Sequence, residues 1–123
     1  AGRVAAADYR IVLAGEASGS AIATAAHVLL AARSLPRERA KGDTVVRYDL
    51  RPLLADIQVV DPGPPVTIGI RTRFHPELGT GRPEEVVLAI SDELANPLTI
   101  ESIRRERLVR ADDRPGDRPD ERP

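Results

Sequence analysis

One segment combines a glycine turn with a helix start, and it constrains the fold more than any other part of the chain. It reads Gly79-Thr80-Gly81-Arg82-Pro83-Glu84-Glu85-Val86-Val87-Leu88. Pro83 suits the first turn of a helix, where its missing N–H would be unpaired anyway. Glu84 and Glu85 then lie near the positive end of the helix dipole, a position that favours carboxylates. The segment therefore predicts a turn that leads directly into a helix.

The helix that begins at Pro83 is expected to bury one face. Four apolar residues recur at helical spacing and fall on that face: Val86, Val87, Ile90 and Leu94. Asn96-Pro97 should end the helix, because a residue before proline is disfavoured in the α conformation. Charged strands are expected on both sides of this unit, at residues 68–74 and 103–109.

The glycine turn itself has two interpretations. Gly79 and Gly81 allow unusual backbone angles, and free N–H groups beside Arg82 would be able to hold a phosphate. The alternative is a plain junction between loop and helix. The segment lacks both the Gly-Lys-Ser/Thr of a phosphate-binding loop and the GxGxxG of a dinucleotide site. Glu84 and Glu85 would also repel an anion at this position.

The composition limits the core and the chemistry. The chain has 123 residues, which suits one domain, and its aromatic residues are Tyr9, Tyr48 and Phe74, so the core must be aliphatic. The net charge of -1 calls for neither nucleic acid nor an acidic partner. The absence of cysteine excludes disulfides, zinc thiolate sites and iron–sulfur clusters on this chain, and no cofactor is expected.

Location and chain ends are the next expectations. No apolar run is long enough for a membrane span and no signal peptide opens the chain, so we expect a soluble cytoplasmic protein with no membrane partner. The chain starts without Met and close to a strand, which indicates a piece of a longer protein. Residues 1–110 are expected to form one domain, and the Asp/Arg/Pro-rich residues 111–123 a disordered tail.

Apolar alternation and turn residues predict the order of the elements. A strand at residues 8–13 precedes an alanine-rich helix at 20–33, which Ser18 or Ser20 caps. The rest follows as a strand pair or one bent strand at 37–49, interrupted at 41–43, then a helical turn at 51–54, and strands at 57–60, 66–73 and 100–110. The class is therefore α+β, as a ferredoxin-like βαββαβ sandwich with an extra hairpin or strand and two helices on one face of an antiparallel sheet.

The sheet face away from the helices is expected to carry arginines. They are Arg47, Arg71, Arg73 and either Arg105 with Arg107 or Arg104. Some RNA-binding sheets present such a face with stacking aromatics, a role open here only to Tyr48 or Phe74. The alternative is a solvated or partner-covered face whose arginines pair with Glu106, Asp49 and Asp56. His27 and His75 have no visible catalytic partner, so the sequence offers no nucleophile, base and orienter set.

Five strings of the chain together carry a resemblance to a known family. They are Ala6-Ala7-Asp8-Tyr9-Arg10-Ile11-Val12-Leu13, Ser34-Leu35-Pro36 with Arg39, Val46-Arg47-Tyr48-Asp49-Leu50-Arg51-Pro52-Leu53, Gly79-Thr80-Gly81-Arg82-Pro83-Glu84-Glu85-Val86 and Ile103-Arg104-Arg105-Glu106-Arg107-Leu108. In their order and spacing these strings resemble one bacterial family, the radical SAM-linked domain of unknown function DUF2344. The resemblance extends over nearly everything up to Arg110 and is to the C-terminal half of the family's domain.

The resemblance implies an accessory role. The family's domain occurs alone or fused after a radical SAM enzyme, its activity is not established, and RNA modification or processing is inferred for it by association. The implied partners are a radical SAM protein or the family's N-terminal half, which this chain lacks, and RNA is a further candidate. Without cysteines this chain can hold no radical SAM cluster, so we expect no enzyme activity and no catalytic residue on it.

Two functions remain open at this level. One is an accessory domain that holds an RNA substrate for the radical SAM enzyme, and the other is a non-catalytic protein-protein or interdomain docking module. The candidate binding residues come from the matched strings and from the arginine-bearing face: Arg47, Asp49, Arg51, Arg71, Arg73, Arg82 and Arg105.

Overall fold

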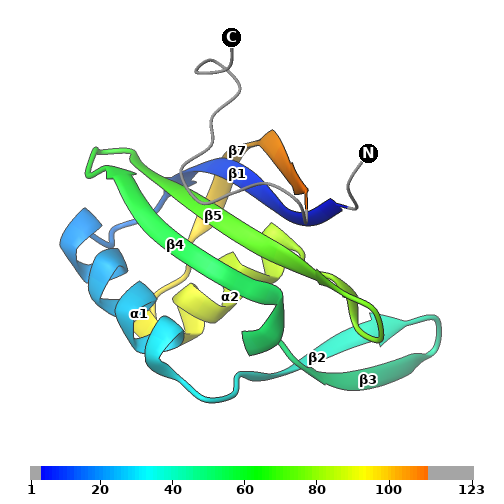
Figure 1. The fold of residues 1–123 in the computed structure, drawn as a ribbon. Coiled ribbons are helices and arrows are strands. Elements are labelled where there is room, and N and C mark those ends of the chain that lie inside the picture. The colour runs from blue at the N-terminus through cyan, green and yellow to red at the C-terminus, as the bar shows by residue number, and fades with distance from the viewer. Residues whose placement is uncertain (1–3, 111–123) are drawn as a thin grey trace, which may run out of the picture.

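The computed structural model describes residues 4–110, and Figure 1 labels their helices and all strands except the short β6. In chain order these are β1 (Val4–Ala14), α1 (Gly19–Ala31), β2 (Pro36–Lys41), β3 (Thr44–Asp49), the 3-10 turn η1 (Arg51–Leu53), β4 (Leu54–Asp61), β5 (Val66–His75), β6 (Gly79–Thr80), α2 (Pro83–Leu94) and β7 (Thr99–Arg110). The tail expected at residues 111–123 lies outside the described residues.

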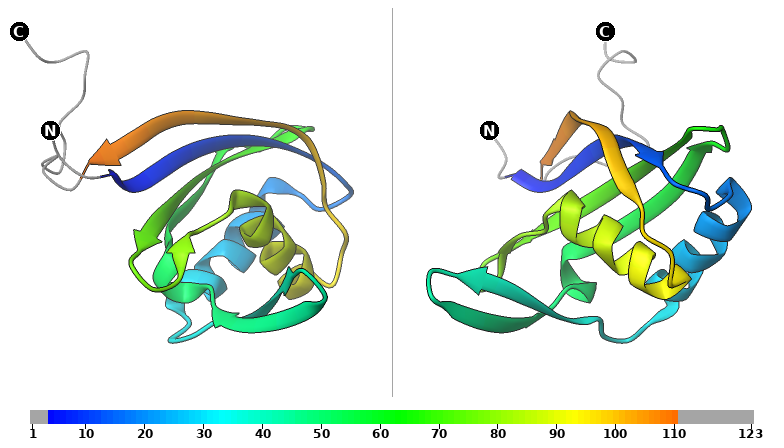
Figure 2. Two further views of the ribbon diagram at one scale, coloured as in Figure 1. Left: turned by 90° about the vertical axis from the view of Figure 1, so that its right-hand side faces the viewer. Right: turned by 180° about the vertical axis from the view of Figure 1, so that it is seen from behind.

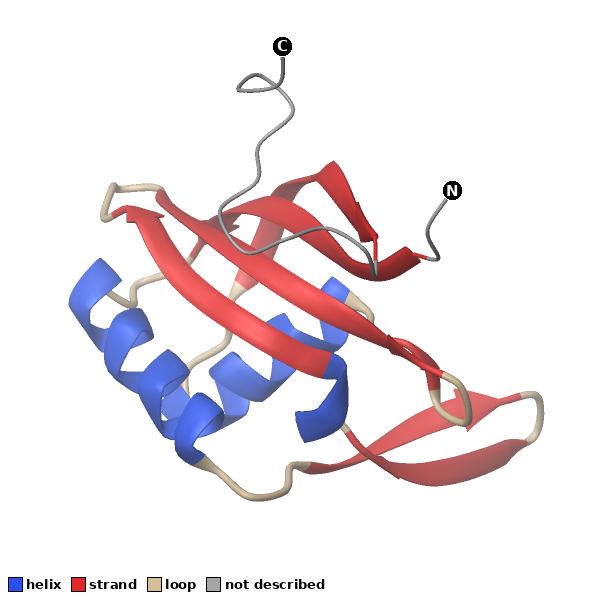
Figure 3. Ribbon diagram, in the orientation of Figure 1, coloured by secondary structure: helices blue, strands red, loops and turns tan. Residues whose placement is uncertain are grey.

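The main sheet has the strand order β4-β5-β1-β7, and each neighbouring pair is antiparallel. The short β6 pairs with the end of β5, and β2 and β3 form a separate two-stranded hairpin. Both helices lie on one side of the main sheet, as Figures 2 and 3 show. The expectation of an α+β fold with two helices packed on an antiparallel sheet is confirmed, and the described chain contains seven strands.

Alternation along β5 and along the second half of β1 separates a core face from an open face. On β5, Val66, Ile68, Ile70 and Thr72 are buried, and on β1 Ile11 and Leu13 are buried. The helices meet these strands with the faces expected from their spacing, namely Ile22, Ala25, Ala26 and Leu29 on α1 and Val86, Val87 and Ile90 on α2. The core is aliphatic, as the scarcity of aromatic residues requires.

The helix ends follow from local chemistry. Ser18 is the N-cap of α1, and its Oγ accepts a hydrogen bond from the N–H of Ala21 at 3.1 Å. Helix α2 begins with Pro83 after an Arg82 N-cap that makes no side-chain capping bond, and it ends with Ala95 in the left-handed region at φ 51°. Within the described part, neither helix is long and apolar enough to cross a membrane.

A β-bulge between β1 and β7 changes which arginines share a face. Asp8 pairs with Arg107 whereas the next residue, Tyr9, pairs with Arg105, so Glu106 is the extra residue of β7. Arg105 therefore lies on the core side with Tyr9, and Arg107 on the open side with Asp8. The expectation that Arg105 and Arg107 would share one face is wrong, because simple alternation does not hold across a bulge.

Gly81 allows a close approach that a larger residue would prevent. A Cβ atom added there would lie 2.6 Å from the backbone oxygen of Leu53 and 3.0 Å from Thr72 Cβ. Gly81→Ala should therefore lower the free energy of unfolding by about 1–3 kcal/mol, the usual range for overpacking. Urea unfolding followed by circular dichroism measures this difference.

Gly69→Ala is the matched control for Gly81→Ala. An added Cβ at Gly69 would make ordinary contact with Val60 Cγ2 at 3.4 Å. The alanine there should be neutral or slightly stabilising, because it removes the conformational freedom of an unfolded glycine. Equal stability of both variants and the wild type would contradict the close packing described at Gly81.

Candidate functional site

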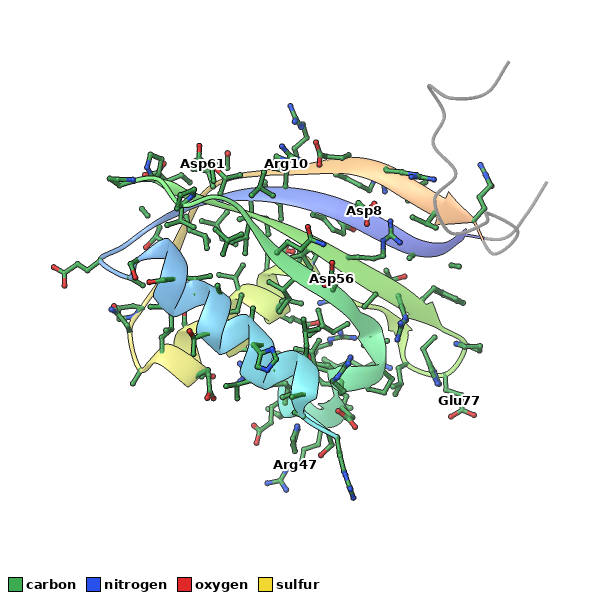
Figure 4. The ribbon with its side chains drawn as sticks, turned by 60° about the vertical axis from the view of Figure 1, so that its left-hand side comes forward. Asp8, Arg10, Arg47, Asp56, Asp61 and Glu77 are labelled. Carbon is green, nitrogen blue, oxygen red and sulfur yellow. The ribbon has the colours of Figure 1, made fainter. Side chains whose placement is uncertain are left out.

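The open face of the sheet contains a hollow of about 640 Å³, here called the sheet hollow and defined by Asp8, Arg10, Asp56, Arg71, Arg73 and Glu106 among its lining residues. Figure 4 shows Asp8, Arg10 and Asp56 on the side of the sheet away from the helices. These six side chains comprise three arginines and three carboxylates, so their formal charges balance. The hollow is therefore charged but not basic.

Ion pairs across the strands satisfy most of these arginines. Arg71 donates from Nε to Asp8 Oδ1 at 2.7 Å and from Nη2 to Asp8 Oδ2 at 2.9 Å. Hydrogen bonding to Asp8 raises the pKa of Arg71 and outweighs the opposite effect of burial. Glu106 accepts from both Arg10 and Arg104 at 3.1 Å.

The pairing differs in part from the one expected. Glu106 is a partner of the arginines as expected, but Asp8 takes the place foreseen for Asp56. Arg104 faces the open side opposite Arg10 on β1. Arg73 also lines the sheet hollow, and it has no hydrogen-bond or ion-pair partner among residues 4–110.

Arg47 does not belong to the sheet, contrary to expectation. It lies on β3 of the separate hairpin, its side chain is 89% exposed, and its nearest carboxylate is Glu38 at 3.8 Å. Figure 4 shows it at the opposite end of the molecule from Arg10. The sequence pattern marked Arg47 correctly as a strand residue but contained nothing to separate a hairpin from the main sheet.

Asp49 and Arg51 are also expected at a binding site, but in the structure their side chains form hydrogen bonds with backbone groups. Asp49 Oδ1 accepts from the N–H groups of Leu35 at 2.7 Å and Arg51 at 2.9 Å. The Arg51 guanidinium donates to the carbonyl oxygens of Leu54 at 2.6 Å and Leu30 at 3.0 Å. These bonds join the end of α1 to η1 and β4, so both residues have structural partners.

A salt bridge that the sequence did not predict ties the hairpin to α2. Arg39 on β2 forms two hydrogen bonds to Glu85, at 2.8 and 2.6 Å, and the side chains are 21% and 15% exposed. The Arg39 guanidinium also lies 4.5 Å from the ring centre of Tyr48. A second contact of the hairpin with α2 lies two helical turns after Glu85, where Asp92 accepts a hydrogen bond from Arg37 at 2.6 Å.

The electrostatics of this contact are consistent with its geometry. Burial alone would raise the pKa of Glu85, but the hydrogen bonds and charge of Arg39 outweigh it and lower that pKa below the ordinary value. Tyr48 and, more weakly, the charge of Arg82 act in the same direction. Burial also raises the pKa of Tyr48, with the negative charge of Glu85 adding to the effect.

A second cavity of about 610 Å³ lies on the helix side, between β1, β7, β2 and the start of α2. It is called the arginine cleft and is defined by Tyr9, Arg39, Arg82 and Arg105 among its lining residues. Of the predicted binding residues, Arg82 and Arg105 meet here, whereas Arg71 and Arg73 line the sheet hollow on the other face. The sequence does not predict this cleft. Arg105 lies on this side because it alternates in step with Ile103, which pairs with the buried Ile11.

The glycine segment lines the cleft, and its backbone groups are committed. Gly79 and Thr80 form β6, which pairs with the end of β5. Gly79 adopts the positive φ of 84° expected for it, whereas Gly81 does not. The N–H of Gly81 donates to the carbonyl oxygen of Arg73 at 3.1 Å, and Pro83 has no N–H to offer. Because the N–H of Gly81 is already bonded and Pro83 has none, this segment is better interpreted as a plain junction between loop and helix than as a turn that holds a phosphate.

Neither histidine is among the residues that line the sheet hollow or the arginine cleft. His27 is exposed on α1, and His75 Nδ1 accepts hydrogen bonds from the N–H groups of Glu77 at 3.1 Å and Leu78 at 3.2 Å. Over residues 4–110, no group of three or more His, Cys, Asp or Glu side chains is arranged to hold a metal ion.

Comparison with known proteins found no matching protein-family model, no matching curated protein and no matching solved structure.

The Arg39–Glu85 salt bridge predicts a pH-dependent stability. Glu85→Gln should lower the free energy of unfolding by about 1–2 kcal/mol at neutral pH, because charged hydrogen bonds between largely buried groups are lost. Since the folded-state pKa of Glu85 is lowered, its contribution is present above the unfolded pKa and disappears as the pH falls through the folded value. The difference in stability between the wild type and Glu85→Gln should therefore disappear at pH values below the ordinary glutamate pKa of about 4.3.

The neighbouring Glu84 provides the control for this measurement. It occupies the same first turn of α2 but has no hydrogen-bond partner in the described part of the chain. Chemical denaturation between about pH 3 and pH 7 should show little effect of Glu84→Gln. An equal loss in both variants at neutral pH would mean that the helix dipole, not Arg39, stabilises Glu85.

Proposed function

We propose that this domain is a non-catalytic accessory module that docks on a protein partner through the open face of the β4-β5-β1-β7 sheet. The observation that carries the proposal is the charge-balanced sheet hollow, with its Asp8–Arg71 pair and the Glu106 pairs. The resemblance to the radical SAM-linked family suggests the partner, which is a radical SAM protein or the family's N-terminal half.

The architecture in this proposal is ferredoxin-like. When β2, β3 and β6 are set aside, the remaining elements run strand, helix, two strands, helix, strand. The antiparallel order β4-β5-β1-β7 agrees with a βαββαβ sandwich, in which the second crossover brings the last strand beside the first. In such a sandwich the helices cover one face and leave the other free for a partner.

The charges favour a protein partner over RNA. RNA binding depends on cations that neutralise backbone phosphates, but Arg71 already pairs with Asp8, and Asp56 and Glu106 would repel phosphate. Neither aromatic residue considered for stacking lies beside Arg71 and Arg73. Tyr48 packs beneath Arg39 on the hairpin, and Phe74 alternates in step with the buried residues of β5. Alternating charges on a solvent-facing surface instead suit a protein surface of complementary charge.

A titration with bulk tRNA separates the two functions. We expect no saturable binding of labelled tRNA to the domain at about 50–200 mM salt, and no difference between the wild type and Arg71→Ala/Arg73→Ala. Fluorescence anisotropy gives this measurement. Micromolar binding that weakens steeply with salt and is lost in the double variant would support the RNA-holding function and overturn docking as the role of this face.

The docking role itself is testable with a charge exchange. Asp8→Arg/Arg71→Asp keeps an ion pair across the strands but reverses its direction on the surface. Binding to the radical SAM protein of the same organism, measured by biolayer interferometry, should weaken about tenfold or more in this variant. Arg47→Ala, at the other end of the molecule, should bind like the wild type. Equal affinity of the exchange variant and the wild type would exclude this face as the docking surface.

A further inference from the structure

The arginine cleft differs in charge from the sheet hollow. Its ionisable lining residues are Arg39, Arg82 and Arg105 with a single carboxylate, Glu84. Arg39 is committed to Glu85, but neither Arg82 nor Arg105 has a hydrogen-bond or ion-pair partner among the described residues. Arg82 acts on Glu85 only through its charge. Two guanidinium groups in this cavity therefore retain their donors for a ligand.

Three separate parts of the chain bring these groups together. Arg105 lies opposite Tyr9 in the β1–β7 pair, and the unshifted register from Ile11–Ile103 to Tyr9–Arg105 places it on the helix side. Arg82 is the N-cap of α2, held between the packed Gly81 and the first helical residue Pro83. The fold thus fixes the backbone positions of both arginines, while the side chains remain exposed to solvent.

Apolar side chains also line the cleft, beside the polar Thr80. Tyr9 packs partly against the core, and Leu78, Pro83 and Ile103 complete the walls. Ile103 is 42% exposed, which leaves an apolar surface open beside the two guanidinium groups. A cavity of about 610 Å³ is within the range of small-molecule sites, and it is larger than a bare phosphate or carboxylate needs.

The start of α2 is not the basis of this site. Its first position is a proline without an N–H, and Glu84 and Glu85 follow in the same turn. What points to an anion is the pair of unpartnered guanidinium groups, whose planar donors match phosphate oxygens in a bidentate geometry.

We propose that the arginine cleft binds a small organic phosphate of mononucleotide size. Arg82 and Arg105 hold the phosphate dianion, and the flat apolar part of the ligand lies against Tyr9 and Ile103. This site is separate from the sheet hollow, so it does not depend on the docking role proposed for that face.

Isothermal titration of the domain with AMP, inorganic phosphate and adenosine tests the site. We expect saturable AMP binding on the order of 0.1 mM, inorganic phosphate weaker by about tenfold, and no binding of adenosine. Arg105→Ala and Arg82→Ala should each weaken AMP binding about tenfold or more. Tyr9→Leu should weaken AMP binding but leave inorganic phosphate unchanged.

Arg73→Ala is the matched control, since Arg73 is also exposed and unpartnered but lines the other face. It should bind AMP like the wild type, and so should the Asp8→Arg/Arg71→Asp exchange, which separates this site from docking. AMP affinity unchanged in both Arg82→Ala and Arg105→Ala would overturn the proposal. Adenosine binding as tight as AMP, or inorganic phosphate as tight as AMP, would overturn the nucleotide-sized phosphate as the ligand.

Discussion

The antiparallel pairing of β1 with β5 is the contact on which the rest of the structure depends. These two central strands alternate in step, so that Ile11 and Leu13 meet Ile68 and Val66 on the buried side and Asp8 meets Arg71 on the open side. A core with so few aromatic rings has to be filled by aliphatic side chains from both strands and both helices. The same pairing that buries the aliphatic side chains also sets acid against base on the outside, so the core and the neutral face have one origin.

Local patterns explain how much of this was predictable. The buried faces of α1 and α2 and the alternation of β5 each depend on neighbours a few residues apart, and those predictions agree with the structure. The bulge at Glu106 and the Arg39–Glu85 bridge, which spans 46 residues, have no local signature. For that reason the sequence predicts the strand arginines on one surface, whereas the fold divides them between two cavities and a hairpin. Asp49 and Arg51 belong to a string that matches the family, and such a match does not separate binding from backbone support.

The two cavities show that the number of arginines in a cavity does not decide how many guanidinium groups are free of a carboxylate partner. The sheet hollow and the arginine cleft contain equal numbers of arginines, yet only in the cleft do two of them lack a carboxylate partner. Arg39 belongs to the cleft wall and to the salt bridge that holds the hairpin on α2. The position of the hairpin and the shape of the cleft are therefore coupled, since movement of β2 away from α2 would remove one wall.

The bulge at Glu106 has a further consequence for the behaviour of the chain among its own copies. In the described sheet, β7 is a terminal strand of 12 residues that pairs on one side only. A long, flat edge of this kind would recruit strands from other molecules and lead to aggregation. Here the register of β7 shifts at three places against β1, and charged side chains crowd the same stretch. The irregularity that separates Arg105 from Arg107 thus also makes this edge a poorer template for pairing with another chain.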